Sequence, residues 1–278
     1  MNALKVAAVF AVMFTFANPA FSQVLSRTLI VMYAGQEKVV VAADSFETIY
    51  TVDTGVVDKK NHCKVAALGN KIIFFATGMF GYSRRTINDA LLPDWTPWGE
   101  AVNAYEGSLS PTPEQLARKW GDVVANHINS EVRASVSRRQ AVEKVSREYG
   151  GGPGQAIFVS APTSKEIQIY YVHIAYDPKD FFYPAYSVIT PYACGAPDRP
   201  YCAFGLPPEE LHEYFDLTTE RARNEVSKWP ANDEVFGTKR MVELGIQYDK
   251  TGILGGSIDV AVLPRNGTVQ WAANPNCK

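Results

Sequence analysis

The chain has 278 residues, 46 % of them hydrophobic, and its formal net charge is −2 at pH 7. This composition is typical of a globular protein, and the lack of a basic excess argues against a nucleic-acid partner, since a phosphate backbone is held by clustered Lys and Arg.

The first 22 residues have the pattern of a cleaved signal peptide. Lys5 precedes an apolar run from Val6 to Ala17 that is too short to cross a bilayer of about 30 Å, and Ala20-Phe21-Ser22 supplies small residues at the positions that signal peptidase inspects. A buried N-terminal helix or a membrane anchor is the alternative, but no second long apolar run occurs. We expect an exported protein, periplasmic or extracellular, without a stable membrane anchor. Its mature chain would start at Gln23 and form a single domain over residues 23–278.

Two hairpins are predicted between residues 28 and 78. Runs rich in Val and Ile at residues 28–34 and 38–43 flank the turn residues 35–37. Residues 64–68 and 72–77 flank Gly69-Asn70, a dipeptide that tolerates positive φ and suits a hairpin turn. From the pattern alone, these are four strands of any β-rich core.

Helices are expected in the next part of the chain. Residues 82–92 are a candidate short helix, and residues 93–113 contain enough Pro, Trp and Gly to be a loop. Thr112-Pro113-Glu114 supplies an N-cap followed by proline, and apolar residues then recur at helical spacing, which predicts a helix to about Glu148. The glycine cluster at residues 150–154 lacks the Lys-Ser/Thr of a nucleotide-binding loop and is interpreted as a connector.

The alternation of strands and helices repeats after this connector. Strands are expected at residues 156–160 and 167–175, helices at 208–215, 218–229 and 235–247, and a closing hairpin at 258–263 and 269–272. Its turn, Asn266-Gly267-Thr268, is also a glycosylation sequon. This block order suits an α+β fold with two stacked antiparallel sheets and helices outside, a four-layer α/β/β/α sandwich.

The four cysteines suggest disulfides in an exported chain. Cys194 and Cys202 bracket a Gly/Pro-rich loop and are the preferred pair, whose closure would contribute about 2–3 kcal/mol. Cys63 and Cys277 would then pair, although three connectivities are open for four cysteines. No CxxC occurs, and the histidines show no paired ligand spacing, so neither a metal nor another cofactor is expected. The histidines are His62, His127, His173 and His212.

The segment from Thr28 to Gly78 resembles the opening of a proteasome β-subunit, in the superfamily of N-terminal-nucleophile (Ntn) hydrolases. There a hairpin begins with the catalytic threonine, its second strand ends in Ala-Ala-Asp-Ser, a lysine opens the next strand and a glycine closes the following one. These places fall on Thr28, Asp44, Lys64 and Gly78. The closing GGSIDVAVLPRNGTV also resembles that family's last strands, so the resemblance covers nearly the whole mature chain. It implies the Ntn-hydrolase sandwich.

The resemblance also implies amide hydrolysis by a threonine whose own α-amino group is the base. A free α-amine has a pKa of about 7.7–8.0. At neutral pH a fraction of the amine is therefore uncharged and can take the proton from the Thr28 hydroxyl. The positive charge of Lys64 would lower the pKa of the α-amino group and that of the Thr28 hydroxyl, and Asp44 would hold the lysine in place. The backbone N–H of Gly78 would donate a hydrogen bond to the oxyanion. The expected enzyme is a threonine-type peptidase or amidohydrolase with a peptide or small amide as its substrate.

Two departures from the family concern the site residues. Lys64 lies a few residues later than the family spacing, whereas Lys60 is closer to that spacing but lacks the strand that follows. We prefer Lys64 for that reason. The aspartate and serine that family members carry before the late Gly-Gly are missing, and Asp249 and Ser257 are nearby but out of register.

A third departure concerns processing. Signal cleavage after Ser22 would leave five residues, ending in Arg27, ahead of Thr28, and an amide nitrogen within the chain cannot act as a base. A second cut is required, and Arg27 suits another protease better than self-cleavage. The alternative function is therefore a catalytically inactive, proteasome-like scaffold or binding protein. A homo-oligomer, as in the rings of that family, is also left open.

Overall fold

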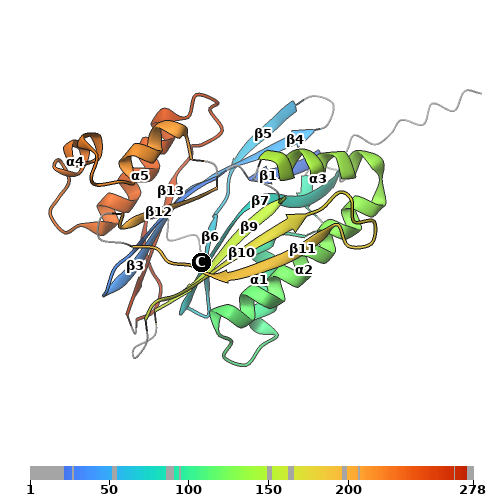
Figure 1. Ribbon diagram of the computed structural model, residues 1–278, viewed down its shortest axis with the longest axis horizontal. Helices are drawn as coiled ribbons and strands as arrows, with labels where there is room; N and C mark the ends of the chain where they lie inside the picture. Colours follow the sequence, from blue (N-terminus) through green and yellow to red (C-terminus); the bar gives the residue numbers. More distant parts are fainter. Residues whose placement is uncertain are drawn as a thin grey trace, which may run out of the picture.

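A computed structural model describes residues 22–26, 28–51, 55–85, 91–93, 95–148, 152–161, 166–195, 199–205, 207–265 and 267–273. They form a mixed α+β structure with two antiparallel sheets and helices (Figure 1). In chain order the elements are β1 (Ser22–Ser26), β2 (Leu29–Ala34), β3 (Lys38–Asp44), β4 (Phe46–Thr51), β5 (Gly55–Asn61), β6 (Val65–Leu68), β7 (Ile72–Arg85), β8 (Leu91–Pro93), α1 (Pro97–Glu106), α2 (Pro113–Ala134), α3 (Val136–Glu148), β9 (Gly154–Ser160), β10 (Gln168–Tyr176), β11 (Ala185–Pro191), β12 (Tyr201–Gly205), η1 (Glu209–Tyr214, a 3₁₀ helix), α4 (Glu220–Val226), α5 (Glu234–Tyr248), β13 (Ile258–Pro264) and β14 (Gln270–Ala273).

The larger sheet has nine strands and the smaller has five. The order in the larger sheet is β11-β10-β9-β7-β1-β4-β5, with β6 and β8 also paired to β7. The order in the smaller sheet is β12-β2-β3-β13-β14. In Figure 1, α4 and α5 lie beside the smaller sheet, and α1, α2 and α3 lie at the opposite side of the molecule.

Three hydrophobic clusters hold these elements together. The first joins α1, α2 and α3 to the larger sheet, where the Trp120 ring lies 5.8 Å from Phe74. The second contains residues of both sheets, including Phe75 and Phe204, whose rings are 5.4 Å apart. The third joins the smaller sheet to η1 and α5. Because successive strand side chains point to opposite faces, β2 contributes Ile30 to the second cluster and its neighbours to the third.

Both early hairpins are confirmed. β2 pairs with β3, and β6 pairs with β7 across Gly69 and Asn70, whose φ values are 55° and 58°. Two successive positive φ values are what a type I′ turn requires. The strands expected at residues 156–160 and 167–175, the last two helices and the closing hairpin also form, as β9, β10, α4, α5 and β13–β14.

The helix expected at residues 82–92 is wrong. β7 continues as a strand to Arg85, and residues 91–93 form β8, which pairs with β7. This stretch of β7 also pairs with β1, with Gln23 opposite Tyr82. The strand conformation there is set by neighbouring strands, which local helical spacing does not reveal.

The loop expected at residues 93–113 contains a helix. α1 begins after Thr96, whose Oγ1 accepts a hydrogen bond of 3.0 Å from Gly99 N, and Pro97 occupies the first turn. The long helix expected after Thr112 is confirmed at its start by a full capping box, but it breaks at Ser135, which has extended backbone angles. α2 and α3 are therefore two helices.

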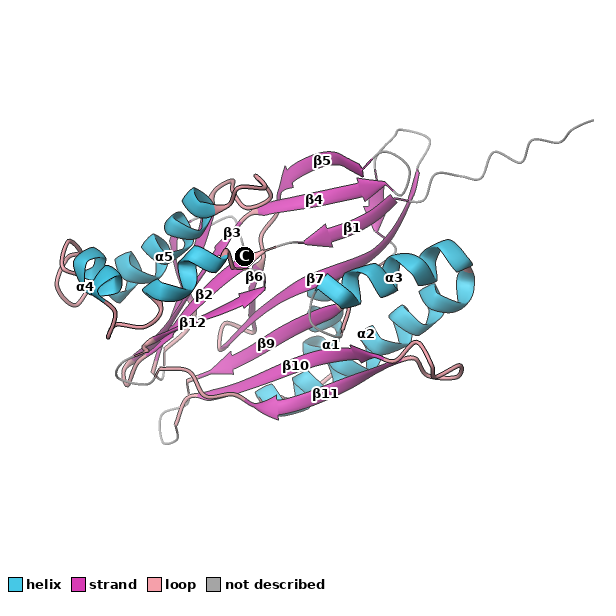
Figure 2. Cartoon of the chain, turned by 45° about the horizontal axis from the view of Figure 1, so that its top comes forward, coloured by secondary structure: helices cyan, strands magenta, loops and turns pink. Residues whose placement is uncertain are grey.

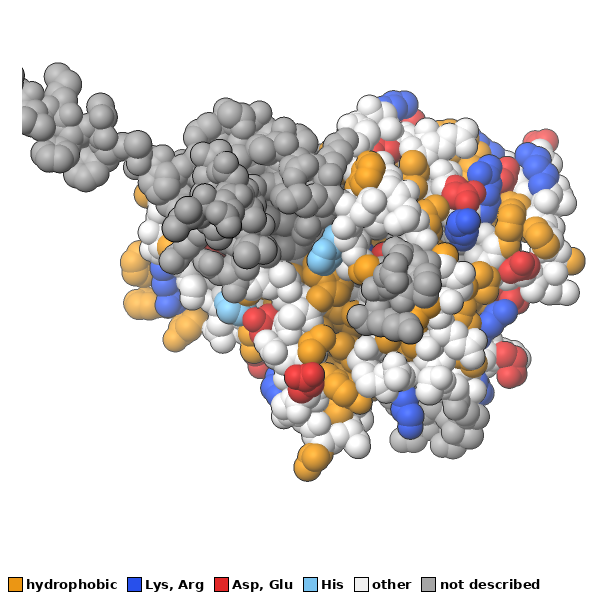
Figure 3. All heavy atoms as spheres, turned by 180° about the vertical axis from the view of Figure 1, so that it is seen from behind, with side chains coloured by type: hydrophobic (Ala, Val, Ile, Leu, Met, Phe, Trp, Pro, Cys, Tyr) orange, Lys and Arg blue, Asp and Glu red, His pale blue; other side chains and the backbone are white. Residues whose placement is uncertain are grey.

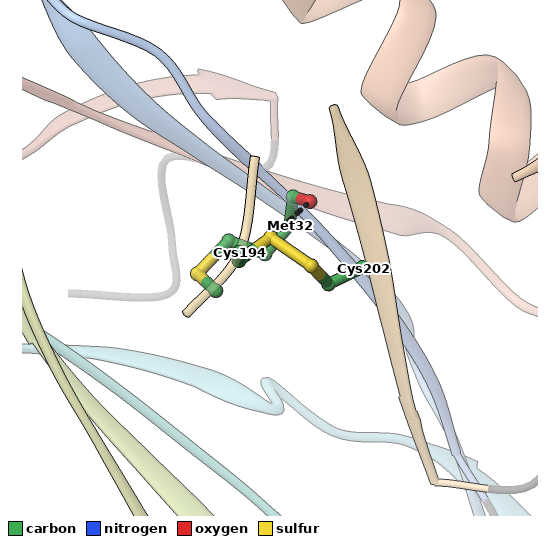
Figure 4. Close-up of a disulfide and its surroundings, with 3 residues drawn as sticks. All are labelled: Met32, Cys194 and Cys202. Carbon is green, nitrogen blue, oxygen red and sulfur yellow. Dashed lines mark hydrogen bonds between the residues drawn. A yellow bond between two sulfur atoms is a disulfide. The ribbon is translucent and has the colours of Figure 1, made fainter. Parts of the chain in front are cut away.

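The disulfide between Cys194 and Cys202 is present, with a Cα–Cα distance of 5.9 Å. It ties the segment after β11 to β12, and Cys194 Sγ lies 3.6 Å from the carbonyl oxygen of Met32 on β2 (Figure 4). Cys63 is also disulfide-bonded, and Cys277, its expected partner, lies outside the described residues.

The expected signal peptide, residues 1–22, lies outside the described residues except for Ser22, the first residue of β1. In the part of the chain that the structure describes, no helix combines the length and apolar character needed to span a membrane.

Candidate functional site

Asp44 lies at the centre of the candidate site. It is the last residue of β3, and its side chain is fully buried. Thr28 Oγ1 donates a hydrogen bond of 2.9 Å to Asp44 Oδ1, and Lys64 Nζ lies 3.2 Å from each carboxylate oxygen. Three residues that are 16 and 20 positions apart in the chain thus meet in one hydrogen-bonded cluster.

Two backbone N–H groups complete the environment of this carboxylate. Leu29 N donates to Oδ1 at 2.9 Å, and Gly255 N donates to Oδ2 at 3.2 Å. Asp44 therefore joins the start of β2, the residue before β6 and the loop before β13. A buried carboxylate with this many donors is held in one position, so it can orient the groups around it.

Lys64 is the lysine that the structure brings to Asp44. It precedes β6, and its side chain is 1 % exposed. A buried ammonium needs a counter-ion, which Asp44 supplies. Lys60, the residue closer to the family spacing, lies within β5, opposite Glu47 of β4.

Thr28 is buried immediately before β2, at a close contact with β12. The last residue of β12, Gly205, has φ +90°, and a Cβ there would lie 1.9 Å from Thr28 O and 3.4 Å from Thr77 Oγ1. Only glycine allows this approach. Gly205 was not among the expected site residues, and its only signal in the sequence is a glycine ahead of Leu206-Pro207-Pro208.

Gly78 lies in β7, next to Thr77. Its φ is +117°, and a Cβ would lie 2.4 Å from Pro153 O. It pairs with Gly154 of β9 on one side and with Ser26 of β1 on the other. Three of the four expected site residues are therefore hydrogen-bonded together. The fourth, Gly78, lies opposite Ser26, two positions before Thr28 in the chain.

The strand β1 occupies a slot directly ahead of Thr28. It lies between β4 and β7 and pairs with both, with Leu25 opposite Thr48 and Ser26 opposite Gly78 (Figure 2). Residues 22–26 thus form an extended strand whose last residue lies opposite Gly78.

Asp249 and Ser257 lie on either side of Gly255, in the loop that precedes β13. The Asp249 carboxylate closes its own loop, accepting from Thr251 N at 2.9 Å and Leu254 N at 2.6 Å. Burial raises its pKa, but these hydrogen bonds outweigh burial and lower the pKa. Ser257 Oγ donates to Ser45 Oγ at 3.1 Å, next to Asp44 in the chain. Both residues shape the loop that presents Gly255 N to Asp44.

The histidines lie in different parts of the fold. His62 contacts Trp98, His127 stacks on Trp95 and lies 3.1 Å from Glu100, and His212 is in η1. His173 is on β10, where burial lowers its pKa. Among the described residues, no group of three or more His, Cys, Asp or Glu could hold a metal ion.

A comparison with known protein families gives no match, and a comparison with curated proteins gives none either.

Proposed function

We propose that this chain is an exported, proteasome-like Ntn hydrolase that cleaves peptide or small amide bonds, with Thr28 as an N-terminal nucleophile after the preceding residues are removed. The observation that carries the proposal is the buried cluster of Thr28, Asp44 and Lys64, with Thr28 Oγ1 2.9 Å from Asp44 and Lys64 Nζ 3.2 Å from it. A nucleophilic hydroxyl, a cation and a carboxylate that positions both are the groups that this chemistry needs.

The distribution of the core supports the fold part of the proposal. One cluster lies between helices and the larger sheet, one contains residues of both sheets, and one lies between the smaller sheet and helices. This distribution supports the proposed four-layer α/β/β/α sandwich and the proposal that residues 23–278 form one domain.

The proposed reaction needs a free α-amino group on Thr28. Its nitrogen takes the proton from Oγ1, and Oγ1 then attacks the carbonyl carbon of the substrate amide. The C–N bond breaks, the leaving amine takes that proton, and an ester to Thr28 remains. Water, deprotonated by the same amine, hydrolyses the ester and regenerates the hydroxyl.

Lys64 and Asp44 would assist without changing their own covalent state. The nearby ammonium of Lys64 favours the neutral amine and the developing alkoxide, and Asp44 fixes the ammonium. In the uncut chain the Thr28 hydroxyl donates to Asp44. With a free amine present, this hydroxyl would donate to the amine instead.

The position of β1 between β4 and β7 supports the proposal that the substrate binds as an extended chain. If β1 leaves, the backbone groups of β4 and β7 that face it lose their strand partner, and a peptide could pair with them. The N–H of Gly78, opposite Ser26, is the proposed oxyanion donor.

The test is the N-terminal residue of the secreted, mature protein, measured by intact mass and terminal sequencing. The proposal expects Thr28, and covalent labelling of that chain by an electrophilic inhibitor of N-terminal threonines. A protease that cuts after Arg27 should produce the same chain from the longer form. A chain that starts at Thr28 but is neither labelled nor able to hydrolyse a peptide library would refute it.

A second candidate, an inactive scaffold or binding protein, is favoured by one observation. Leu254 and Ile253 precede Gly255-Gly256 where the family carries polar residues, and Asp249 is engaged within its own loop. This candidate expects a stable chain that starts near Gln23 and is not labelled.

A further inference from the structure

β11 is the outer edge of the larger sheet and is chemically suited to pairing. Among the described strands it pairs with β10 alone, and Figure 2 shows it as the outermost strand. Its seven residues, AYSVITP, include no charge. Natural sheet edges usually carry Lys, a bulge or a covering segment, because an uncharged edge offers its free backbone groups to another strand.

The two faces of β11 differ. Ser187 faces α2, where its Oγ donates to Asp122 at 3.2 Å. The alternate residues Tyr186 and Val188 point away from α2 and are 52 % and 39 % exposed. The helix thus covers one face and, through the side-chain amide of Asn129, also bonds the backbone N–H and C=O of Ala185 at 2.9 Å each. The rest of the edge and the other face remain accessible.

The loop before β11 is an exposed aromatic knob formed by Phe181, Phe182 and Tyr183, which are 78 %, 70 % and 66 % exposed. Figure 3 shows hydrophobic side chains projecting at the left edge, the side of α2, α3 and this loop after the half turn from Figure 1. Such a run of exposed aromatics is unusual on a monomer and marks an interaction site.

The knob is held in place before any partner arrives. Asp180 Oδ1 accepts from Phe182 N at 2.8 Å and from Tyr183 N at 3.0 Å. Arg133 donates to the carbonyl oxygen of Phe182, and its guanidinium lies 5.7 Å from the centre of the Tyr183 ring. A preformed contact surface loses little conformational entropy on association.

A hollow of about 590 Å³ lies at the other end of the same strand. It is lined by Glu166, Tyr170, Pro191 and Tyr192, among others. One edge strand therefore has an aromatic knob before its first residue and a hollow at its last. A surface with complementary features at its two ends is self-complementary under a two-fold rotation.

We propose that β11 pairs antiparallel with β11 of a second copy of this chain, about a two-fold axis at Val188, the centre of the strand. Ser187 then lies opposite Ile189 of the other copy, and each knob approaches the hollow of the other copy. The uncharged strand brings no like charges together at the axis.

The first experiment is sedimentation velocity on the full mature chain at micromolar concentrations. A dimer is expected for the wild type, and Val188→Lys should convert it to a monomer by placing two ammonium groups at the axis. Val102→Lys is the matched control, since Val102 is 40 % exposed on α1. It should leave the dimer intact, and circular dichroism should show both variants folded.

The second experiment tests the register. Val188→Cys should form a disulfide-linked dimer under mild oxidation, because residues opposite each other in an antiparallel pair have Cα atoms about 4.5–5.5 Å apart. Tyr186→Cys should not, because its two copies would lie about 13 Å apart along the strands. A wild type that is monomeric, or a dimer that survives Val188→Lys, would overturn the proposal. A dimer in which Tyr186→Cys cross-links and Val188→Cys does not would overturn the register.

Discussion

Lys64 Nζ lies 3.2 Å from each carboxylate oxygen of Asp44, and neither side chain is more than 1 % exposed. A buried pair of this kind is weak evidence for a net gain in stability, because both charges lose their hydration. Removing one partner is strongly destabilising, since the other charge then remains buried and uncompensated.

Asp44→Asn is therefore expected to lower the free energy of unfolding by about 3–5 kcal/mol, measured by urea denaturation. Lys64→Met should have a similar effect, and the double variant should recover part of the loss. The control is Lys239→Met, which removes an exposed pair with Glu243 at 3.7 Å and should cost less than about 1 kcal/mol. Equal effects for Asp44→Asn and Lys239→Met would contradict this account.

Thr28→Ala and Thr28→Ser separate catalysis from folding in a chain that begins at residue 28. Thr28→Ala removes the hydroxyl and should abolish both hydrolysis and inhibitor labelling, while costing about 1 kcal/mol of stability through the loss of the hydrogen bond that the hydroxyl donates. Thr28→Ser keeps a hydroxyl and should retain labelling. Persistent turnover by a folded Thr28→Ala chain would rule out Thr28 as nucleophile.

Gly78 and Gly154 form a matched pair for a test of backbone strain. They lie opposite each other in β7 and β9. Gly78→Ala combines φ +117° with a Cβ 2.4 Å from Pro153 O, so thermal unfolding should show a loss of about 2 kcal/mol or more. Gly154→Ala should be tolerated, because its Cβ would meet only Thr77 O, at 3.6 Å. A larger loss of stability for Gly154→Ala than for Gly78→Ala would contradict this account of the backbone at Gly78.

The disulfide between Cys194 and Cys202 should contribute about 2–3 kcal/mol, since it closes a short loop in the unfolded chain. The double variant Cys194→Ala/Cys202→Ala should unfold at correspondingly lower urea concentration without a loss of secondary structure. Replacing both cysteines avoids a free thiol. An unchanged midpoint would mean that the loop is ordered without the bond.

Two half-buried tyrosines predict a loss of stability at high pH. Burial raises the pKa of Tyr201 and of Tyr171 to about 12, above the usual value of 10. The folded state then holds these protons more tightly, so the stability is complete below pH 10 and falls as the pH rises through 12. We expect about 1–2 kcal/mol per tyrosine, after discounting for partial exposure. Tyr201→Phe should reduce the loss of stability between pH 10 and 12. A variant whose stability falls in parallel with that of the wild type would assign the loss to other groups.

The sequence predicts strands well where each carries its own apolar pattern. β2, β3, β6 and the start of β7 are apolar runs around turn residues, and the Gly69-Asn70 turn has the φ values that the dipeptide favours. β4 and β5, with sequences FETIYT and GVVDKKN, are mixed with polar residues and were missed. Their conformation depends on pairing with each other and with β1, which is information that a local pattern lacks.

The helix α1 was missed for a different reason. Thr96-Pro97 is the same N-cap and proline signal that correctly placed the start of α2 at Thr112-Pro113, but the surrounding Trp, Pro and Gly favoured a loop. The site residues were found through a family pattern. Gly205 and Gly255 contact the site residues through their backbones. Because glycine has no side chain, the sequence gives almost no signal for such contacts.

The position of β1 has a mechanical consequence. Among the described strands, β4 and β5 reach the rest of the larger sheet only through β1. At its base, this hairpin is held by Ser45 and Phe46, whose N–H groups donate to Gly255 O at 3.1 Å. If proteolysis after Arg27 releases β1, the hairpin loses its lateral support and becomes a flap hinged beside Asp44. An incoming extended chain would restore the missing strand, so occupancy of the slot and closure of the flap would become one event.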